Sequence, residues 1–365
     1  MKKIVIIGAG FAGLAALSRF YNYHKRQGLE ITLINAKQQS SFLPLLPDCL
    51  GRGIRQEYLV LDLAALSHKK NFNFIKDKVT ALELAKKEVS TSVLTLNYDF
   101  LIIASGSETN FYGNAEIEKN AFKLDDVQDA AYLRQALDEK DYDAYLVAGG
   151  GYTGIEVATN LRVYLNKRKI HKKIIIVERS SSILGALPEW MQDYVLANLK
   201  KSGIEVFTDT SIEKVTGFSR PMLIWAAGVR TCDFIQDLKV EKNTQGRIKT
   251  DACLRVNASC FAAGDAAYFS YKNNFLRMAV QFAIMQGGCA AENIIRSLNG
   301  KNLLSYKPVD LGLIIPLANN KACGIILGVR MQGWLPLLLH YIMCIYRAYG
   351  FKNKLGILKD LLAGK

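Results

Sequence analysis

The feature that most constrains this chain is a supersecondary unit that occurs twice. Each copy shows an apolar strand, a glycine-rich turn, a helical stretch and a second apolar strand. The segments of the first copy are 2–7, 12–26 and 30–34, and those of the second copy are 144–148, 153–168 and 173–177. Two strands joined through a helix are parallel neighbours in one sheet. Two such units, about 140 residues apart, therefore predict an α/β protein with two nucleotide-binding domains.

The first turn carries glycines with the spacing of a dinucleotide-binding turn. Gly8 allows the tight turn, Gly10 lets the backbone approach a pyrophosphate, and Gly13 lets the helix pack close to the strand. The helix N-terminus would then face the phosphates with its free N–H groups and the positive end of its dipole. The position that usually holds an acid for a ribose hydroxyl is Asn35, which offers a hydrogen bond without charge.

The second turn repeats the pattern with Gly149, Gly151 and Gly154. Here the acid at the end of the second strand is present as Glu178. A carboxylate at this place accepts a hydrogen bond from the 2′-hydroxyl of NAD and repels the 2′-phosphate of NADP. The sequence therefore predicts a preference for NADH over NADPH, which the neighbouring Arg179 would weaken.

A third turn of small residues, at 262–265, ends in Asp265 and precedes a long helical stretch at 278–298. Its carboxylate suits a sugar-like hydroxyl close to a phosphate. A glycine–aspartate pair taken alone is typical of an ordinary turn. It supports a cofactor site here only because it accompanies two dinucleotide-binding patterns.

The composition narrows the remaining classes. Half of the 365 residues are hydrophobic, which allows a sizeable core and excludes disorder as the main state. The net charge is 47 − 33 = +14, so the surface attracts anions. The seven cysteines form no CxxC or CxxxxC pattern, which fits a reducing cytosolic face rather than a disulfide framework. The four histidines show no HxxxH or HExxH spacing, so we expect no metal site.

Two segments share features with targeting or membrane signals. The apolar start of the chain is interrupted by the first glycine turn and is therefore interpreted as a strand rather than a signal peptide. The apolar run 334–346 is shorter than the roughly 18 residues that a spanning helix needs. It is followed at 347–365 by five basic residues against Asp360, with apolar residues at near-helical spacing. This pattern predicts an in-plane amphipathic anchor on an anionic leaflet. The alternative is a helical hairpin packed on the protein or on a second copy.

Another basic cluster lies at 167–173, between the helix and the second strand of the second unit. Nucleic-acid binding would require stacking aromatic side chains among these charges, and none are interleaved there. We interpret the cluster as a solvated loop and expect no nucleic-acid partner.

Several further runs carry a family resemblance. The elements YDFLIIASGS at 98–107, WAAGV at 225–229 and AAGDAA at 262–267, together with the two glycine turns, resemble the two-dinucleotide-binding-domain flavoproteins. Within that group, FLPLL at 42–46, GSETNFYGN at 106–114 and GGGYTGIE at 149–156 look most like type II NADH dehydrogenases. These are single-chain, monotopic NADH:quinone oxidoreductases. The resemblance covers most of residues 1–310.

The resemblance implies two Rossmann-like domains, one for FAD and one for NADH, with the second inserted in the first. A C-terminal amphipathic helical region would anchor the protein to the membrane. The implied boundaries are 1–110 and 251–310 for the two parts of the FAD-binding domain, 111–250 for the NADH-binding domain, and 311–365 for the membrane-associating region.

The resemblance also assigns roles to individual residues. The expected FAD-binding residues are Gly8, Gly10, Gly13, Asn35, Ser107 and Asp265, and the expected NADH-binding residues are Gly149, Gly151, Gly154 and Glu178. Two residues are expected to be catalytic: Glu156 near the nicotinamide, and Gln281 near the isoalloxazine and the quinone. The family's AQxAxQ pattern is altered here, because Val280 replaces its alanine and Met285 its second glutamine. Gln286 is displaced by one residue, which is about 100° on a helix.

The implied reaction moves a hydride from NADH to FAD and then two electrons to a membrane quinone, without proton pumping. The enzyme would lie peripherally on the cytoplasmic face of the cell membrane, with the quinone and an anionic lipid surface as partners and a homodimer as a further assembly. Two alternatives stay open: a soluble NADH-dependent thiol or peroxide reductase that uses Cys49, and a flavin-binding redox sensor docked through its tail. A sulfide:quinone reaction is disfavoured, because no cysteine lies between residues 50 and 231.

Overall fold

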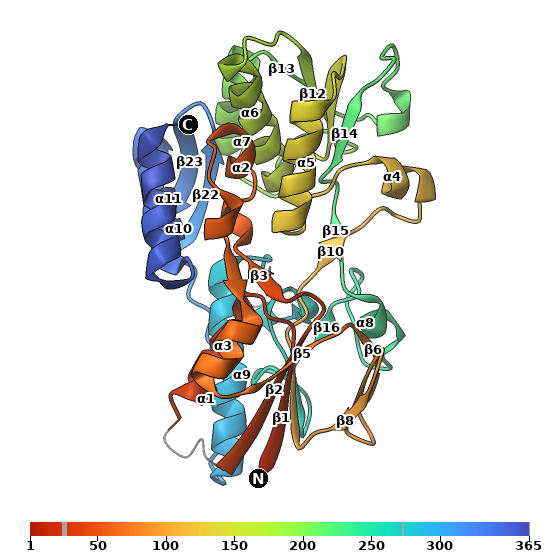
Figure 1. The fold of residues 1–365 in the computed structure, drawn as a ribbon, viewed down its shortest axis with the longest axis vertical. Coiled ribbons are helices and arrows are strands. Elements are labelled where there is room, and N and C mark those ends of the chain that lie inside the picture. Colours follow the sequence, from red (N-terminus) through yellow and green to blue (C-terminus); the bar gives the residue numbers. More distant parts are fainter. Residues whose placement is uncertain (24–27, 272–273, 365) are drawn as a thin grey trace. The chain divides into compact units, whose positions relative to one another are not determined.

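The computed structural model describes residues 1–23, 28–271 and 274–364 (Figure 1). The chain forms two compact units, each assembled from three segments. The first unit comprises Met1–Ser40, Leu61–Glu108 and Arg230–Asp310, and the second comprises Ser41–Val60, Thr109–Val229 and Leu311–Lys365. The two units are therefore interleaved in the sequence, as the expected insertion of one nucleotide-binding domain in the other requires.

A six-stranded sheet with the order β17-β18-β9-β1-β2-β5 forms the centre of the first unit. β1 pairs in parallel with both β2 and β9, which confirms the predicted parallel arrangement. The strands are β1 (Lys2–Ile7), β2 (Leu29–Asn35), β5 (Asn73–Lys76), β9 (Phe100–Ile103), β17 (Arg255–Asn257) and β18 (Cys260–Ala262). The helix expected at 12–26 is α1 (Phe11–Tyr21), and positions 24–26 of that prediction lie outside the described residues.

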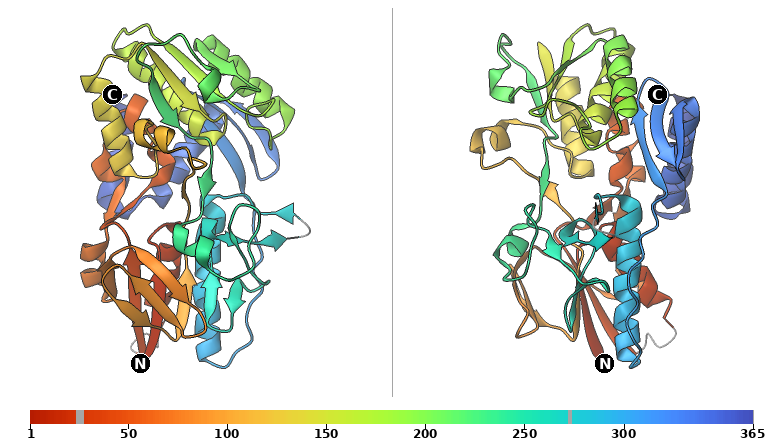
Figure 2. Two further views of the ribbon diagram at one scale, coloured as in Figure 1. Left: turned by 90° about the vertical axis from the view of Figure 1, so that its right-hand side faces the viewer. Right: turned by 180° about the vertical axis from the view of Figure 1, so that it is seen from behind.

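Both faces of this sheet are buried, which explains why β1 is apolar without alternation. Ile4 and Ile6 pack with residues of α1 and α9 (Val280–Leu298) on one face. Val5 and Ile7 face a second cluster on the other side. Figure 2 shows α9 running alongside the strands of this unit.

The other face of the sheet is covered by residues that the sequence analysis assigned to the NADH-binding domain. Residues 230–250 were expected in the NADH-binding domain, but the structure groups them with the first unit. The reason is packing, since Phe234 and Ile235 of α8 (Asp233–Asp237) and Ile248 of β16 (Ile248–Lys249) belong to the same buried cluster as Val5. The other elements of this unit are α3 (Leu63–Lys70), β6 (Val79–Glu83), β7 (Glu88–Thr91), β8 (Thr95–Asn97), β19 (Ala267–Tyr268), β20 (Ser270–Tyr271) and β21 (Asn274–Phe275).

A four-stranded parallel sheet with the order β13-β12-β11-β14 forms the centre of the second unit. Its strands are β11 (Ala144–Ala148), β12 (Lys173–Val177), β13 (Ile204–Phe207) and β14 (Met222–Trp225), and its helices are α4 (Ala115–Asn120), α5 (Val127–Glu139), α6 (Tyr152–Lys167) and α7 (Glu189–Lys201). β11 and β12 have the predicted bounds, and α6 differs from the predicted helix by one residue at each end.

The C-terminal segment is an integral part of the second unit. It forms an antiparallel sheet, β22 (Gly312–Leu317), β23 (Lys321–Ile326) and β24 (Val329–Gly333), followed by α10 (Trp334–Arg347) and α11 (Gly350–Ala363). Ile315, Leu317 and Cys323 of this sheet lie in the same buried cluster as the α6 side chains. The two helices were expected, whereas the sheet between 312 and 333 was not.

The segment 41–60 contacts both C-terminal helices within the second unit. It contains α2 (Asp48–Gly51). The buried Asp48 accepts a hydrogen bond from the Tyr341 hydroxyl of α10 at 2.8 Å. Asp360 of α11 accepts hydrogen bonds from the Arg55 backbone N–H at 3.0 Å and from its guanidinium.

In the described part of the chain, no helix combines the length and apolarity that a membrane crossing needs.

Candidate functional site

The first glycine turn has the geometry of a phosphate-binding turn. Gly8 has a φ of +97°, a conformation that residues with a side chain rarely adopt. A Cβ at Gly13 would collide with the carbonyl group of Gly8, so α1 can approach the strand only with glycine there. At Gly10, by contrast, no described atom beyond its chain neighbours lies within 4 Å of a Cβ position. The backbone at Gly10 is therefore open to a ligand at the N-terminus of α1, where no side chain caps the helix.

Asn35 lies directly on this turn. Its Oδ1 accepts a hydrogen bond from the Ala9 backbone N–H at 3.0 Å, and its Nδ2 donates to the Lys37 carbonyl at 2.7 Å. The side chain therefore fixes the middle of the glycine turn, besides any contact that it makes with a ribose.

The structure brings the predicted Ser107 and Asp265 together. The Ser107 hydroxyl donates to Asp265 Oδ2 at 3.0 Å. Burial raises the pKa of the Asp265 carboxyl, and Ser107 and Arg247 oppose that shift. Arg247 was missed by sequence reasoning because it belongs to no motif. It is buried, and its Nε donates to the Asp265 carbonyl at 3.0 Å, so it fixes the backbone of the turn.

The altered stretch at the start of α9 contains two glutamines with different roles. Gln281 Nε2 donates to Asp310 Oδ1 at 3.0 Å, and Asp310 also receives two hydrogen bonds from Arg277. The displaced Gln286 is almost completely buried, and its Oε1 accepts a hydrogen bond from the Gly264 backbone N–H at 2.8 Å. Gln286 therefore stabilises the Asp265 turn, whereas Met285 packs in an apolar cluster.

The second glycine turn has the same construction in the second unit. Gly149 has a φ of +105°, and a Cβ at Gly154 would collide with the Gly149 carbonyl. Gly151 is open, since no described atom other than its chain neighbours lies within 4 Å of a Cβ there. α6 begins at the next residue, and no side chain caps its N-terminus, which is the end of a helix that favours a phosphate.

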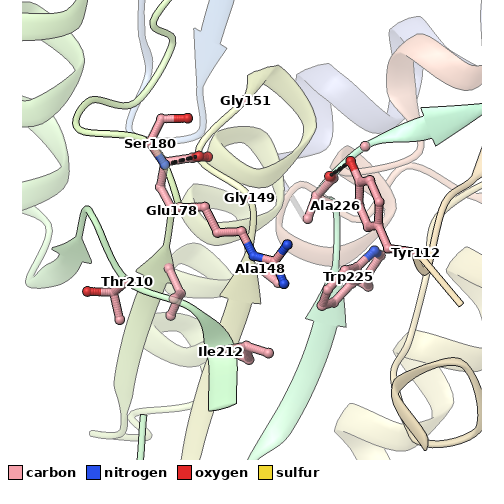
Figure 3. A pocket seen from close by; sticks show the side chains of 14 residues that line it. Tyr112, Ala148, Gly149, Gly151, Glu178, Ser180, Thr210, Ile212, Trp225 and Ala226 are labelled. Atoms are coloured by element: carbon pink, nitrogen blue, oxygen red, sulfur yellow. Dashed lines mark hydrogen bonds between the residues drawn. The ribbon is translucent and has the colours of Figure 1, made fainter. Parts of the chain in front are cut away.

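A pocket of about 430 Å³ lies over this turn (Figure 3). Glu178 is at its edge, and its two carboxylate oxygens accept hydrogen bonds from the backbone N–H groups of Gly150 at 2.7 Å and Ser180 at 2.8 Å. Arg179 also lines the pocket. The predicted Gly149, Gly151 and Glu178 therefore converge on one pocket. The remaining lining residues are Tyr112, Ala148, Val177, Ser180, Thr210, Ile212, Trp225, Ala226, Ala227 and Gly228.

Glu156 lies in the first turn and a half of α6, two residues after Gly154. Burial raises the pKa of its carboxyl well above the ordinary value, and the nearby Asp48 raises it further. Burial likewise raises the pKa of Asp48 to about 6, against the opposing charge of Arg52.

Cys49 lacks the properties of a redox thiol. Its side chain is buried, and its Sγ donates a weak hydrogen bond to the Leu45 carbonyl at 3.7 Å. Burial raises the pKa of the thiol far above its ordinary value, and Asp48 adds to that effect. Because the thiolate is the reactive form, this environment opposes thiol chemistry. All seven cysteines are free.

Both glycine turns fit a bound dinucleotide. Each combines a positive-φ glycine, an open glycine backbone and an uncapped helix N-terminus, which is the arrangement that accepts a pyrophosphate. In the first unit, the Ser107–Asp265 pair and Asn35 surround the turn with hydroxyl, carboxyl and amide groups suited to FAD. In the second, Glu178 stands where a nicotinamide dinucleotide presents a ribose.

The fold and these two sites define a class of oxidoreductase with two dinucleotide-binding units in one chain. Residues 2–287 match the family profile described as pyridine nucleotide-disulphide oxidoreductase. The chain belongs to this family, which confirms the expected fold class and the expected cofactors, FAD and NADH.

Individual relatives place the chain more narrowly. Type II NADH:quinone oxidoreductase of Staphylococcus aureus is 26% identical over 370 residues, which cover 91% of each chain. This similarity agrees with the resemblance read from the motifs. Among solved structures, NDH2 from Plasmodium falciparum in complex with NADH superimposes with a TM-score of 0.84 at 18% identity, covering 99% of this chain and 97% of that one. The sulfide:quinone oxidoreductase of Aquifex aeolicus gives a TM-score of 0.78 at 17% identity, covering 98% and 92%.

Proposed function

We propose that this chain is an FAD-dependent NADH:quinone oxidoreductase. The observation that carries the proposal is the pair of equivalent open glycine turns, one in each unit. Two turns allow one chain to bind a resident flavin and a nicotinamide dinucleotide as electron donor. The curated relatives named type II NADH:quinone oxidoreductase support a quinone as the acceptor.

When bound, FAD supplies the redox chemistry, taking a hydride from NADH and releasing two electrons to the acceptor. The protein binds and orients the reactants. In the first unit, Gly8, Gly10 and Gly13 would hold the FAD pyrophosphate, with Asn35, Ser107 and Asp265 around its sugar portions. In the second, Gly149, Gly151 and Gly154 would hold the NADH pyrophosphate, with Glu178 at the ribose.

Two further residues are proposed to act during the reaction. Glu156 would hold a proton on its carboxyl near the nicotinamide portion of NADH, which the raised pKa of this group supports. Gln281 would contact the acceptor side, and its amide is oriented by Asp310. Reduction of a quinone to a quinol consumes protons, so a polar amide such as that of Gln281 is a suitable group beside the acceptor.

We further propose that α10 and α11 dock the protein on an anionic lipid surface at the cytoplasmic face of the cell membrane. A row of large apolar side chains is exposed on these two helices: Trp334, Leu335, Leu338, Ile342, Tyr346, Phe351, Leu355, Leu358 and Leu362. Lys352 and Lys359 are exposed on α11 beside this row. Apolar side chains flanked by cations suit the interface of a negatively charged leaflet. A homodimer that covers this row is the competing arrangement.

The test of the reaction is anaerobic. The purified flavin-loaded protein is mixed with NADH while the flavin absorbance is recorded, and a soluble quinone is then added. Bleaching by NADH and fast recovery with quinone are expected, and the same result is expected for Cys49→Ser. Bleaching that quinone cannot reverse would exclude a quinone acceptor, and loss of recovery in Cys49→Ser would favour the thiol reductase instead.

A further inference from the structure

Tyr112, in the segment 110–113, lines the pocket in the second unit, a role that the glycine motif does not predict. Three hydrogen bonds attach this segment to the residues at and after the end of β14. The Asn110 backbone N–H donates to the Gly228 carbonyl at 3.0 Å, and Trp225 Nε1 donates to the Asn110 carbonyl at 2.8 Å. The Tyr112 hydroxyl donates to the Ala227 carbonyl at 2.9 Å.

The position of the Tyr112 side chain depends on its neighbours. Gly228 has a φ of +136°, and a Cβ there would collide with the Tyr112 hydroxyl, so only glycine leaves room for the phenol. Tyr112 itself has a φ of +54°, a conformation that is uncommon for a residue with a side chain. Its backbone N–H donates to Asn110 Oδ1 at 2.8 Å, which stabilises that turn. Four hydrogen bonds and one steric requirement therefore place the ring at the wall of the pocket.

The ring of Tyr112 lies at the end of the pocket opposite the ribose-binding acid. Figure 3 shows Glu178 and Ser180 on one side of the glycine turn, and Tyr112, Trp225 and Ala226 on the other. In a dinucleotide-binding unit, the strand-end acid binds the adenosine ribose and the glycine turn binds the pyrophosphate. The end that remains receives the nicotinamide riboside half.

The geometry points to Tyr112 as a binding residue for the nicotinamide riboside half of NADH, oriented for this purpose by its hydrogen bond to the Ala227 carbonyl. This inference rests on the proposed function, because it takes the pocket to be the NADH site. The side chain is 58% exposed, so much of the ring is open to a ligand while the hydroxyl remains anchored. An aromatic face beside a flat, polar ring system provides stacking area at low entropic cost.

The test compares a whole dinucleotide with its adenine half. Dissociation constants for NAD⁺ and for ADP are measured by calorimetry on the flavin-loaded protein and on its Tyr112→Phe variant. We expect Tyr112→Phe to weaken NAD⁺ binding about three- to tenfold, because the ring loses the hydrogen bond to the Ala227 carbonyl that holds it in position for the ligand. ADP, which lacks the nicotinamide riboside, should bind within twofold of its original constant. The KM for NADH should rise in parallel, with kcat nearly unchanged.

The matched control is Tyr132→Phe, which removes the hydroxyl of another exposed tyrosine of the same unit, outside the pocket lining. It should change neither constant. Unchanged NAD⁺ binding in both Tyr112→Phe and Tyr112→Ala would overturn the inference, and so would an equal loss of NAD⁺ and ADP, which would mean that the glycine turn itself is disturbed. Failure of the unaltered protein to bind either ligand would instead refute NADH binding in this pocket, and with it the proposed function.

Discussion

The side chain of Asn35 accepts a hydrogen bond from the backbone N–H of Ala9 at 3.0 Å, across the first glycine turn. Glu178 makes the same contact with Gly150 in the second unit, at 2.7 Å. In both units, an oxygen at the end of the second strand therefore holds the second residue of the glycine turn. The amide at position 35 preserves this structural contact without the negative charge that Glu178 has.

Replacing Glu178 with alanine should weaken NADH binding and narrow the preference for NADH over NADPH. The variant loses the proposed ribose acceptor, and it also leaves the N–H groups of Gly150 and Ser180 without their carboxylate. We expect the KM for NADH to rise roughly tenfold or more, since hydrogen bonds to a charged group contribute about 1.5–3 kcal/mol each. Steady-state kinetics with both dinucleotides provide the measurement.

The control for this prediction is Glu205→Ala, which removes an acid on the neighbouring strand β13 that pairs with Lys173. It should leave both KM values unchanged. An unaltered ratio of the two KM values in Glu178→Ala would refute the assignment of Glu178 to the ribose.

Replacing Asn35 with alanine should cause loss of the flavin. The change removes the hydrogen bonds to Ala9 and Lys37, so the turn that we propose to hold the FAD pyrophosphate loses its side-chain support. Each neutral hydrogen bond contributes about 0.5–1.5 kcal/mol, so a several-fold rise in the fraction of flavin-free protein is expected. The ratio of flavin to protein after gel filtration measures the effect. Full flavin retention would show that Asn35 is dispensable for the turn.

Removing the carboxylate that accepts the Gln281 hydrogen bond should slow only the transfer of electrons from the flavin to the acceptor. In Asp310→Ala, the amide of Gln281 loses the carboxylate that accepts its hydrogen bond. Stopped-flow measurements should show bleaching by NADH within twofold of the original rate and a several-fold slower recovery with quinone. Glu292→Ala, on the same helix α9, is the control and should affect neither phase. Equal slowing of both phases would contradict a role of Gln281 on the acceptor side.

Asp48 should make the stability of the protein depend on pH. Its folded pKa of about 6 is higher than the ordinary value of 3.8, so between these values the folded state binds the proton more tightly than the unfolded chain. The contribution of this carboxyl to the free energy of unfolding therefore falls as the pH rises through that window, by up to about 3 kcal/mol.

Urea unfolding at pH 4 and pH 7.5 tests this prediction in the unaltered protein and in Asp48→Asn, whose amide oxygen still accepts from Tyr341. The free energy of unfolding of the unaltered protein, relative to that of the variant, should be higher at pH 4 than at pH 7.5. The control is Asp193→Asn, at an exposed position of α7. Its free energy of unfolding should differ from that of the unaltered protein by the same amount at both pH values. If the free energy of unfolding of the unaltered protein instead rose with pH relative to that of Asp48→Asn, the pKa of Asp48 would be lowered by folding, and the proposed effect of burial would be excluded.

Removing exposed apolar side chains from α11 should release the protein from anionic vesicles. Phe351 and Leu362 are 81% and 79% exposed, so the double change Phe351→Ser and Leu362→Ser costs the fold little. Burial of one such side chain contributes about 1.5–3 kcal/mol, so vesicle binding should fall at least tenfold. Sedimentation with phosphatidylglycerol-containing vesicles measures the binding.

Val93→Ser, at a similarly exposed position of the first unit, is the control for the vesicle experiment and should leave binding intact. Substitution is preferable to truncation, because α10 and α11 are held by Asp48 and Arg55 and their removal would expose the interior of the second unit. If the double variant still binds vesicles fully and a dimer dissociates instead, the apolar row is an interface between copies.

Much of the fold could be predicted because its signals are local. The strands β1, β11 and β12 are short apolar runs directly before a glycine turn or after a helix, and glycine spacing fixes the phosphate-binding turns. The contacts that complete the sites depend on tertiary packing instead. Arg247 and Gln286 reach the Asp265 turn across 18 and 22 residues of the chain. No pattern marks Arg247, and the displaced glutamine pattern at Gln286 does not reveal its hydrogen bond to Gly264.

The boundary between the two units and the residues of the pocket wall also depend on tertiary packing, which local sequence patterns do not reveal. Phe234 and Ile235 look like residues of any helix, and only their burial against the first sheet assigns 230–250 to that unit. Tyr112 lies in a run that carried a family resemblance, yet its role follows from the hydroxyl–carbonyl contact with Ala227, which sequence spacing cannot reveal.

The interleaving of the two units has a practical consequence for engineering. The polypeptide passes from one unit to the other at 40/41, 60/61, 108/109, 229/230 and 310/311. Neither unit can therefore be excised or transplanted as a single contiguous segment, since each would need two new splices to be expressed alone. The short segment 41–60 is hydrogen-bonded to both C-terminal helices, because it contains the partners of Tyr341 and Asp360. A chimera that exchanged α10 and α11 for those of a relative would have to exchange this distant stretch as well.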